Sequence, residues 1–208
     1  LGTSMARALA EAGASVVLTS RDRERAEAAA AALPRVGDAR HLGIALDHMR
    51  ADTLPTAFEA AVSHADRIDV LVNNAHEALP ADWTIVTPVQ FDRHLSNATG
   101  YFTLARLMRG HAVERGAPAS IILLGSMYGL VASYPDAYEG IGPASPVAYH
   151  ALKGGILHMT RHLAAYWAAD GVRVNCLSPG PFPHEGAPAA MVERLKTKLP
   201  MRRMGRPH

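Results

Sequence analysis

The sequence predicts an α/β fold in which a parallel sheet carries helices on both faces. Short apolar segments typical of buried strands alternate along the chain with longer segments whose apolar residues recur at helical spacing. Because the strand segments are continuously apolar rather than alternating, they are expected to be buried on both faces. The chain has 208 residues, 49% of them hydrophobic and 19% charged, which is enough for one substantial core. Together these observations predict one doubly wound domain over residues 1–208.

The elements of the first half follow from helix-ending residues and apolar runs. Gly13 ends a helix predicted from Met5 to Ala12, and Pro34 ends an alanine-rich helix from Arg23 to Leu33. Runs of apolar and β-branched residues between such signals are predicted to be strands. By these rules the other elements of this half are the strands Ser15–Thr19, His41–Leu46 and Ile68–Val72 and the helix Asp52–His64.

The second half contains longer helices and two long loops. The predicted elements are the helices Pro88–Gly110 and Ala148–Ala169 and the strands Ser120–Leu124 and Val172–Leu177. Two segments rich in Gly and Pro follow strands and are predicted to be loops, Met127–Pro146 and Pro179–Pro188. Ligands of open α/β sheets bind beyond the carboxyl ends of the strands, so these loops are candidates for contact with a substrate.

Composition and charge narrow the possible functions. The formal net charge is only +2, so neither nucleic acid nor a membrane is a predicted partner. No apolar run in the sequence reaches the roughly 18 residues of a membrane helix. The single Cys176 has no partner for an internal disulfide, which favours a reducing, cytoplasmic location. His158 and His162 have a spacing that metal ligands use, but no third ligand is near them in the sequence, so no metal site is predicted.

Tyr149 and Lys153 stand four residues apart on one predicted helix and share a face of it. A nearby cation favours the phenolate, so the lysine is expected to lower the pKa of the tyrosine toward the range of a general acid or base. Taken alone, the pair could also be an ordinary surface pair on a helix.

The pair belongs to an ordered series of motifs that covers nearly the whole chain. The series comprises Gly2 before an alanine-rich helix, Asp47, Asn73-Asn74-Ala75, Asn97, Gly125-Ser126, Tyr149-x-x-x-Lys153, and Arg173-Val174-Asn175 leading to Pro179-Gly180. In content and order it resembles the short-chain dehydrogenase/reductase family. The resemblance implies a Rossmann-like fold and an NAD(P)-dependent enzyme that interconverts a secondary alcohol and a ketone.

The resemblance extends to both ends of the chain. Leu1-Gly2-Thr3 resembles the end of the family's glycine-rich loop, whose first strand and earlier glycines would precede residue 1. Arg203 to Pro207 resembles the stretch before the family's final helix and strand. By this comparison the chain is expected to be a fragment of a longer enzyme, with part of the cofactor cradle outside it.

The resemblance also implies a set of cofactor-binding residues. Ser20 stands at the end of the second family strand, where an acid would favour NAD, and Arg21 follows it. A serine and an arginine can bind a 2′-phosphate, so NADP(H) is favoured, although Asp22 is adjacent and NAD(H) stays possible. Asp47 is expected to accept a hydrogen bond from the adenine amino group. The remaining expected contacts are Gly2, Asn74 and Ala75 near the adenosine half, and Tyr149, Lys153, Pro179 and Gly180 near the nicotinamide half.

The catalytic roles likewise follow from the resemblance. Tyr149 would exchange a proton with the substrate oxygen, and Lys153 would lower its pKa and bind the nicotinamide ribose. Ser126 would hydrogen-bond the reacting oxygen, and Asn97 would hold a water that links Lys153 to solvent. The chain departs from the family at His76, where glycine is usual, and after Pro179-Gly180, where no threonine follows.

The substrate is less clearly marked. The long interval between Ser126 and Tyr149 resembles that of enzymes acting on sugars or sugar acids, and Tyr138, Glu139 and His184 could contact a polyol. The interval could equally serve oligomer contacts. Phe182 could stack near the nicotinamide or simply pack against other residues.

Two alternatives to a sugar or polyol oxidoreductase stay open: a 3-oxoacyl-thioester reductase and a non-catalytic binding protein. By resemblance, the two longest predicted helices imply a homodimer or homotetramer.

Overall fold

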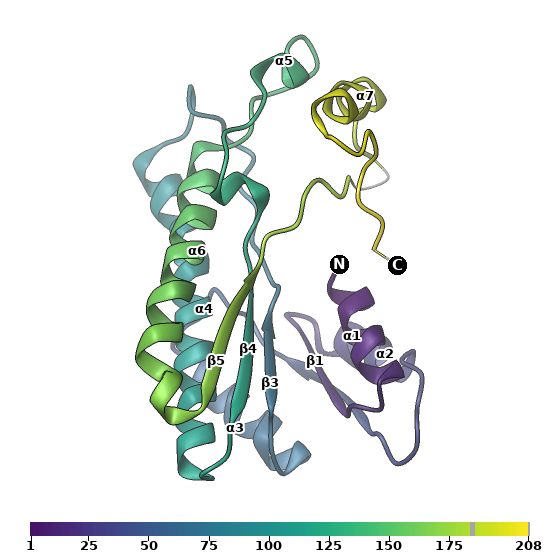
Figure 1. Ribbon diagram of the computed structural model, residues 1–208, viewed down its shortest axis with the longest axis vertical. Coiled ribbons are helices and arrows are strands. Elements are labelled where there is room, and N and C mark those ends of the chain that lie inside the picture. The colour runs from purple at the N-terminus through teal and green to yellow at the C-terminus, as the bar shows by residue number, and fades with distance from the viewer. Residues whose placement is uncertain (184–185, 208) are drawn as a thin grey trace. The chain divides into compact units, whose positions relative to one another are not determined.

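A computed structural model of the chain describes residues 1–183 and 186–207 (Figure 1). The strands of the described part are β1 (Val16–Ser20), β2 (His41–Ala45), β3 (Val70–Asn73), β4 (Ala119–Leu124) and β5 (Val172–Leu177). Its helices are α1 (Gly2–Glu11), α2 (Arg23–Ala31), α3 (Leu54–Ala65), α4 (Pro88–Glu114), α5 (Pro135–Tyr138), α6 (Val147–Trp167) and α7 (Ala189–Lys198). Short 3₁₀ turns follow β4, at Met127–Gly129, and α6, at Ala168–Asp170.

The chain falls into two compact units that are interleaved along the sequence. The first comprises Leu1–Ala75, Thr99–Ile121 and Trp167–Arg173, and the second comprises His76–Ala98, Ile122–Tyr166 and Val174–His208. The predicted organisation as a single domain over residues 1–208 stays a prediction.

A parallel pair of strands, β1 and β2, forms the start of the first unit. The register places Val16 opposite His41 and Ser20 opposite Ala45, so both strands end at the same edge. Helix α2 lies directly on β2, because a Cβ atom on Gly43 would collide with the backbone of Ala26 and Glu27. In Figure 1, α1 and α2 lie beside β1. This part of the unit has a small hydrophobic core. Its buried members are Ala6, Ala10, Val16 and Leu33, and the partly buried Leu9, Ala14 and Leu18 pack against them.

The remaining strands form a three-stranded sheet in the order β3-β4-β5. The amide of Ala119 donates to the carbonyl of Gly171 at one end of the β4–β5 pair, and the amide of Gly125 donates to Leu177 at the other. The two bonds advance by the same number of residues on each strand, so β4 and β5 are parallel.

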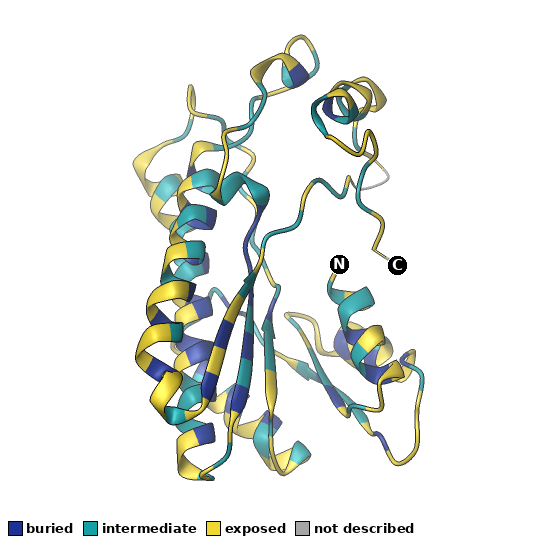
Figure 2. Cartoon of the chain, in the orientation of Figure 1, coloured by how far each residue is buried: buried dark blue, intermediate teal, exposed yellow. Residues whose placement is uncertain are grey.

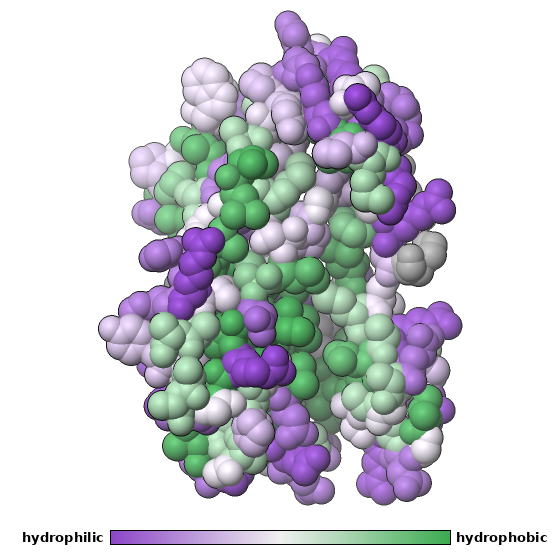
Figure 3. Space-filling view, in the orientation of Figure 1, coloured by the Kyte–Doolittle hydropathy of each residue, from purple (hydrophilic) through white to green (hydrophobic). Residues whose placement is uncertain are grey.

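Helix boundaries follow local signals where the sequence contains them. Asp22 caps α2, since its carboxylate accepts a hydrogen bond from the amide of Arg25 over 3.1 Å. Helix α6 begins at Val147, directly after Pro146. Buried residues line one side of α6 and exposed residues the other (Figure 2). The face seen in Figure 3 mixes hydrophilic and hydrophobic side chains, in line with the balanced composition.

Two helices were not predicted. Helix α5 occupies four residues of the predicted loop Met127–Pro146, and α7 follows the predicted loop that ends at Pro188. The two helices are in contact in the second unit, where Nη1 of Arg194 donates to the carbonyl oxygens of Asp136 and Glu139 over 3.1 and 2.6 Å. Among the described residues, no helix combines the length and the apolar character needed to cross a bilayer.

Candidate active site

Helix α6 places Tyr149 and Lys153 one turn apart in the second unit. Lys153 is only 4% exposed, and its Nζ donates a hydrogen bond to the carbonyl oxygen of Leu124 over 2.6 Å. Its Nζ also lies 5.7 Å from the centroid of the Tyr149 ring. Tyr149 itself is partly exposed. The geometry therefore brings a buried cation to a tyrosine that substrate can reach, rather than forming a surface pair.

Burial changes the titration of Lys153. The loss of solvation lowers the pKa of its ammonium to about 8, from an ordinary value of 10.5. Its hydrogen bond to Leu124 goes to a neutral carbonyl oxygen. The side chain still carries its proton at neutral pH, so it remains a positive charge next to the phenol.

Ser126 lies directly after β4 and is buried. It caps the 3₁₀ turn Met127–Gly129, and its Oγ accepts a hydrogen bond from the amide of Tyr128 over 3.1 Å. A hydroxyl that accepts a bond keeps its own proton for donation to another oxygen. The turn sits on α6, because a Cβ atom on Gly129 would lie 2.6 Å from the carbonyl oxygen of Lys153.

Asn97 is buried on α4 and its side chain is fully engaged by backbone groups. Its Oδ1 accepts from the amide of Glu77 over 2.8 Å, and its Nδ2 donates to the carbonyls of Glu77 and His94 over 3.2 and 2.8 Å. The amide therefore joins the segment after β3 to α4. That Asn97 also holds a relay water stays a prediction.

Two histidines lie beside the Tyr149 ring. The centroid of the His76 ring lies 5.3 Å from that of Tyr149 and the centroid of His94 lies 6.2 Å from it, both edge-on. In the sequence, His76 stands out only as a departure from the family's glycine, and nothing marks His94. A histidine inside a helix gives no sequence signal of the side chains that it will meet.

The loop between Ser126 and Tyr149 brings together a group of polar aromatic side chains. The hydroxyls of Tyr128 and Tyr138 lie 3.2 Å apart, and the Tyr128 ring stacks on His150 with 4.7 Å between centroids. Nε2 of His150 lies 3.0 Å from Oγ of Ser145. Burial and the neighbouring Tyr138 raise the pKa of Tyr128, so its hydroxyl stays neutral.

The segment after β5 was expected to meet the nicotinamide. The carbonyl of Pro179 accepts a hydrogen bond from the amide of Met127 over 3.0 Å, and Gly180 is exposed. The ring of Phe182 lies against Gly205, where a Cβ atom would collide with it, so Phe182 has a packing role. His184 lies outside the described residues.

The expected adenosine-side residues lie in the first unit, at the start of α1 and at or after the carboxyl ends of β1, β2 and β3. Gly2 opens α1, and a Cβ atom on it would lie 2.7 Å from Nδ2 of Asn74. Leu1 gives α1 no side-chain cap, and the first amides of a helix have no partner within it, so this end of α1 could hold a phosphate group. These residues fit a dinucleotide, which supplies the hydride acceptor or donor when it is bound.

Ser20, Arg21 and Asp47 would hold the adenosine end. Oγ of Ser20 accepts from the amide of Asp22 over 3.2 Å, and the exposed Arg21 follows directly after β1. Oδ1 of Asp47 accepts from the amide of Met49 over 3.0 Å, which fixes the carboxylate in the turn after β2. Ala75 is exposed after β3.

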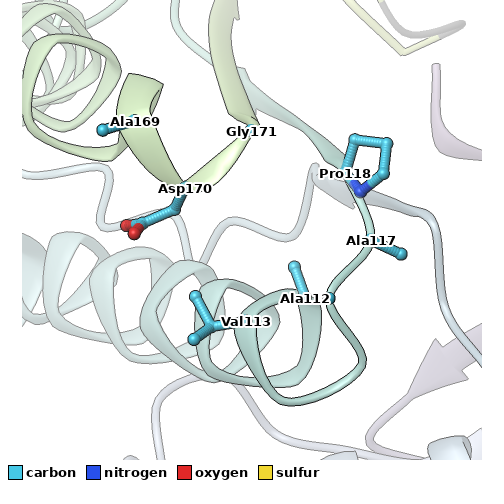
Figure 4. A pocket seen from close by; sticks show the side chains of 8 residues that line it. Ala112, Val113, Ala117, Pro118, Ala169, Asp170 and Gly171 are labelled. Carbon is cyan, nitrogen blue, oxygen red and sulfur yellow. The ribbon is translucent and has the colours of Figure 1, made fainter.

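Two other features are not part of this site. A pocket in the first unit is lined by residues 112–113, 116–118 and 169–171 (Figure 4). These residues precede β4 and β5, so the pocket lies at the opposite ends of the strands from those that bind ligands in such sheets. The described residues contain no group of three potential metal ligands, and His162 stacks on Tyr166 with 4.3 Å between ring centroids.

Comparisons with known proteins identify the family. A family model described as enoyl-(acyl carrier protein) reductase matches residues 1–208. The chain is 31% identical over 218 residues to L-fucose dehydrogenase of Bos taurus, an alignment that covers 100% of the chain and 74% of that relative. It is 35% identical over 191 residues to the L-tagatose-forming galactitol 2-dehydrogenase of Cereibacter sphaeroides, covering 86% of the chain and 66% of that relative.

Solved structures agree with this assignment. The crystal structure of a short-chain type dehydrogenase/reductase from Mycobacterium marinum superposes with a TM-score of 0.85 at 27% identity, covering 99% of the chain and 79% of that structure. These matches confirm the predicted Rossmann-like α/β fold. The chain therefore belongs to the short-chain dehydrogenase/reductase family and is an NAD(P)-dependent oxidoreductase that acts on a CH–OH group.

Proposed function

We propose that the enzyme interconverts a secondary alcohol and a ketone on a sugar or polyol, with Tyr149 as the general acid/base. The observation that carries the proposal is the buried ammonium of Lys153, bound to the Leu124 carbonyl and 5.7 Å from the Tyr149 ring. A fixed cation at this place favours the phenolate, the form of tyrosine that accepts a proton.

A bound nicotinamide would supply the two-electron oxidant that takes the hydride of the carbinol C–H bond. In the oxidation direction, the Tyr149 phenolate would accept the proton of the substrate O–H bond as the alcohol becomes a ketone. Ser126 donates its hydroxyl hydrogen to the reacting oxygen, which orients the alcohol and stabilises charge on that oxygen. Lys153 compensates the negative charge that Tyr149 carries before the proton arrives.

A hydroxylated substrate is supported by two observations. Relatives include enzymes named for L-fucose, galactitol and D-threitol. The loop after Ser126 contributes the hydroxyls of Tyr128 and Tyr138, and α6 contributes the imidazole of His150. These hydrogen-bonding groups suit a polyol. Such neutral donors and acceptors match neighbouring alcohols better than a long acyl chain.

NADP(H) is the proposed cofactor. Support comes from Ser20 at the end of β1 and the exposed Arg21 after it, since a guanidinium pairs well with a phosphate. We further propose a homodimer or homotetramer, because α4 and α6 are the long helices through which the family pairs. A cytoplasmic location is proposed from the single Cys176.

The test measures turnover by the full-length protein with NADPH and with NADH. One substrate panel contains ketoses and the corresponding polyols, and the other contains 3-oxoacyl thioesters. Turnover of a ketose or polyol that is lost in Tyr149→Phe is the expected result. Preferred turnover of the 3-oxoacyl thioesters would overturn the substrate class, and turnover by Tyr149→Phe at the wild-type rate would overturn the role of Tyr149.

A further inference from the structure

A pair of histidines occupies the surroundings of Tyr149 in the second unit. His76 follows β3 and His94 lies on α4, and their ring centroids are 5.1 Å apart. Each ring also meets the Tyr149 ring edge-on, with interplanar angles of 70° and 82°. Three separate segments of the chain therefore place three rings together, and one of these rings carries the proposed general acid/base.

The hydrogen bond between the histidines defines where their protons lie. Nε2 of His76 and Nε2 of His94 are 3.3 Å apart, so one of the two nitrogens carries a proton and the other accepts it. His94 is 1% exposed, and its Nδ1 has no hydrogen-bond partner in the part of the chain that the structure describes. A proton on that Nδ1 would be a buried donor without an acceptor, which is costly. The bond therefore runs from Nε2–H of His94 to Nε2 of His76.

We propose that His76 and His94 form a neutral hydrogen-bonded pair that holds the Tyr149 ring edge-on and so positions its hydroxyl for proton transfer. The two histidines are positioning residues, because they act through Tyr149. The inference rests on the proposed function of Tyr149. Two edge-on contacts restrict rotation of the phenol ring, and the bond between the histidines restricts both of them.

The charges around the pair favour its neutral state. Lys153 on α6 opposes a further positive charge, and burial together with Lys153 lowers the pKa of His94. Glu77 attracts a proton, but its carboxylate already pairs with Arg93 over 2.6 Å. On α6 the other titratable neighbours are Tyr149 and His150, whose rings are 6.3 Å apart. A second proton at Nε2 of His76 would also break the bond to His94.

Two variants of the full-length enzyme separate positioning from general stability. His94→Phe keeps an aromatic edge but removes the hydrogen bond, and His76→Gly introduces the residue that the family usually has. Each is expected to lower kcat by about tenfold, the scale of a modest misplacement of a catalytic group, with KM for the nicotinamide cofactor unchanged. His94→Gln keeps a donor and is expected to recover most of the loss. His158→Ala, an exposed histidine of α6, is the control and should behave as wild type.

A pH readout gives a second test that needs no turnover. In wild type, the imidazole C–H proton resonance of His94 should stay at its neutral position below pH 6.5, the ordinary pKa of histidine. In His94→Phe, His76 loses its bond to His94, and the pH profile of kcat should change shape relative to wild type. A wild-type His94 resonance that titrates near 6.5 would overturn the proposal even if a variant fails to fold.

These measurements separate a failure of the proposed function from a failure of the positioning pair. If Tyr149→Phe keeps wild-type turnover, the proposed function fails. If Tyr149→Phe is inactive while His76→Gly and His94→Phe keep the wild-type kcat and pH profile, the positioning pair fails and the proposed function stands. A loss of kcat in both histidine variants, with recovery in His94→Gln, supports the pair.

Discussion

The ammonium of Lys153 donates to the carbonyl oxygen of Leu124, with 2.6 Å between the two atoms. Leu124 is the last residue of β4, and Ser126 follows two positions later. One strand end therefore fixes the lysine of the site through its backbone and carries the serine of the site in the next turn. A change in the path of the chain after β4 would move both groups.

Replacing Lys153 should change how stability depends on pH. The pKa of Lys153 is about 8 in the folded protein and near 10.5 when exposed, so the unfolded chain holds the proton over this interval while the folded chain does not. The free energy of unfolding is therefore expected to rise from pH 8 to pH 10.5, by as much as about 3 kcal/mol from this group. Lys153→Met should lack that rise, as measured by denaturant unfolding at both pH values.

Lys196→Met is the matched control for this measurement, since Lys196 is a partly exposed lysine paired with Glu193. It should keep the wild-type dependence on pH. Equal slopes for wild type and Lys153→Met would show that Lys153 is not a buried cation.

The two hydroxyls of the site can be removed with little change in shape. Tyr149→Phe and Ser126→Ala should each lower kcat by roughly 10²- to 10⁴-fold, because proton transfer and stabilisation of the reacting oxygen are lost. Steady-state kinetics with the best substrate of the ketose and polyol panel measures the effect. Tyr166→Phe removes a hydroxyl from a tyrosine that is 72% exposed and should leave the rate unchanged. A comparable loss in that control would point to general damage to α6.

Arg21 should determine the preference between the two nicotinamide cofactors. Arg21→Ala is expected to raise KM for NADPH by about tenfold or more and to leave KM for NADH nearly unchanged, since only the former has a 2′-phosphate to pair with. Arg23→Ala is the control, because Arg23 is exposed and pairs with Glu27 on α2. An equal change in KM for both cofactors would show that Arg21 does not bind the 2′-phosphate.

Gly43 should tolerate no side chain. A Cβ atom there would collide with the backbone of α2, so Gly43→Ala is expected to destabilise the protein by about 1–3 kcal/mol or more. Gly142→Ala is the control, since nothing lies within 4 Å of the atom it adds. Thermal unfolding should show a lower Tm for Gly43→Ala alone. Similar Tm values would mean that α2 does not rest on β2.

The sequence predicted the strands and long helices well where they end in strong signals. Strand β5 is found from Val172 to Leu177 as predicted, and α6 begins one residue earlier and ends two residues earlier than the predicted helix Ala148–Ala169. Helix α1 begins at Gly2 rather than Met5, because Leu1 provides no side-chain cap that could mark the start. Helix α7 was missed, since prolines before it favoured a loop and its short polar segment has little periodicity.

The site could be predicted only in part. The spacing of Tyr149 and Lys153 is a local property of one helix and is visible in the sequence. The partner of Lys153 is a backbone oxygen 29 residues away, and a backbone atom has no residue type by which to recognise it. The contacts of His94 with His76 and Tyr149 depend equally on how three segments pack, which a single sequence does not show.

Gly129 packs against the backbone of α6 and so holds the turn after Ser126 in place independently of the residues that follow it. The turn that carries Ser126 is fixed on the helix at Gly129, before residues 130–146 begin. Of the groups proposed to contact a polyol, Tyr138 lies in residues 130–146, whereas Tyr128 and His150 lie outside them. Changes in residues 130–146 can therefore alter part of the substrate contact while the reacting groups keep their places.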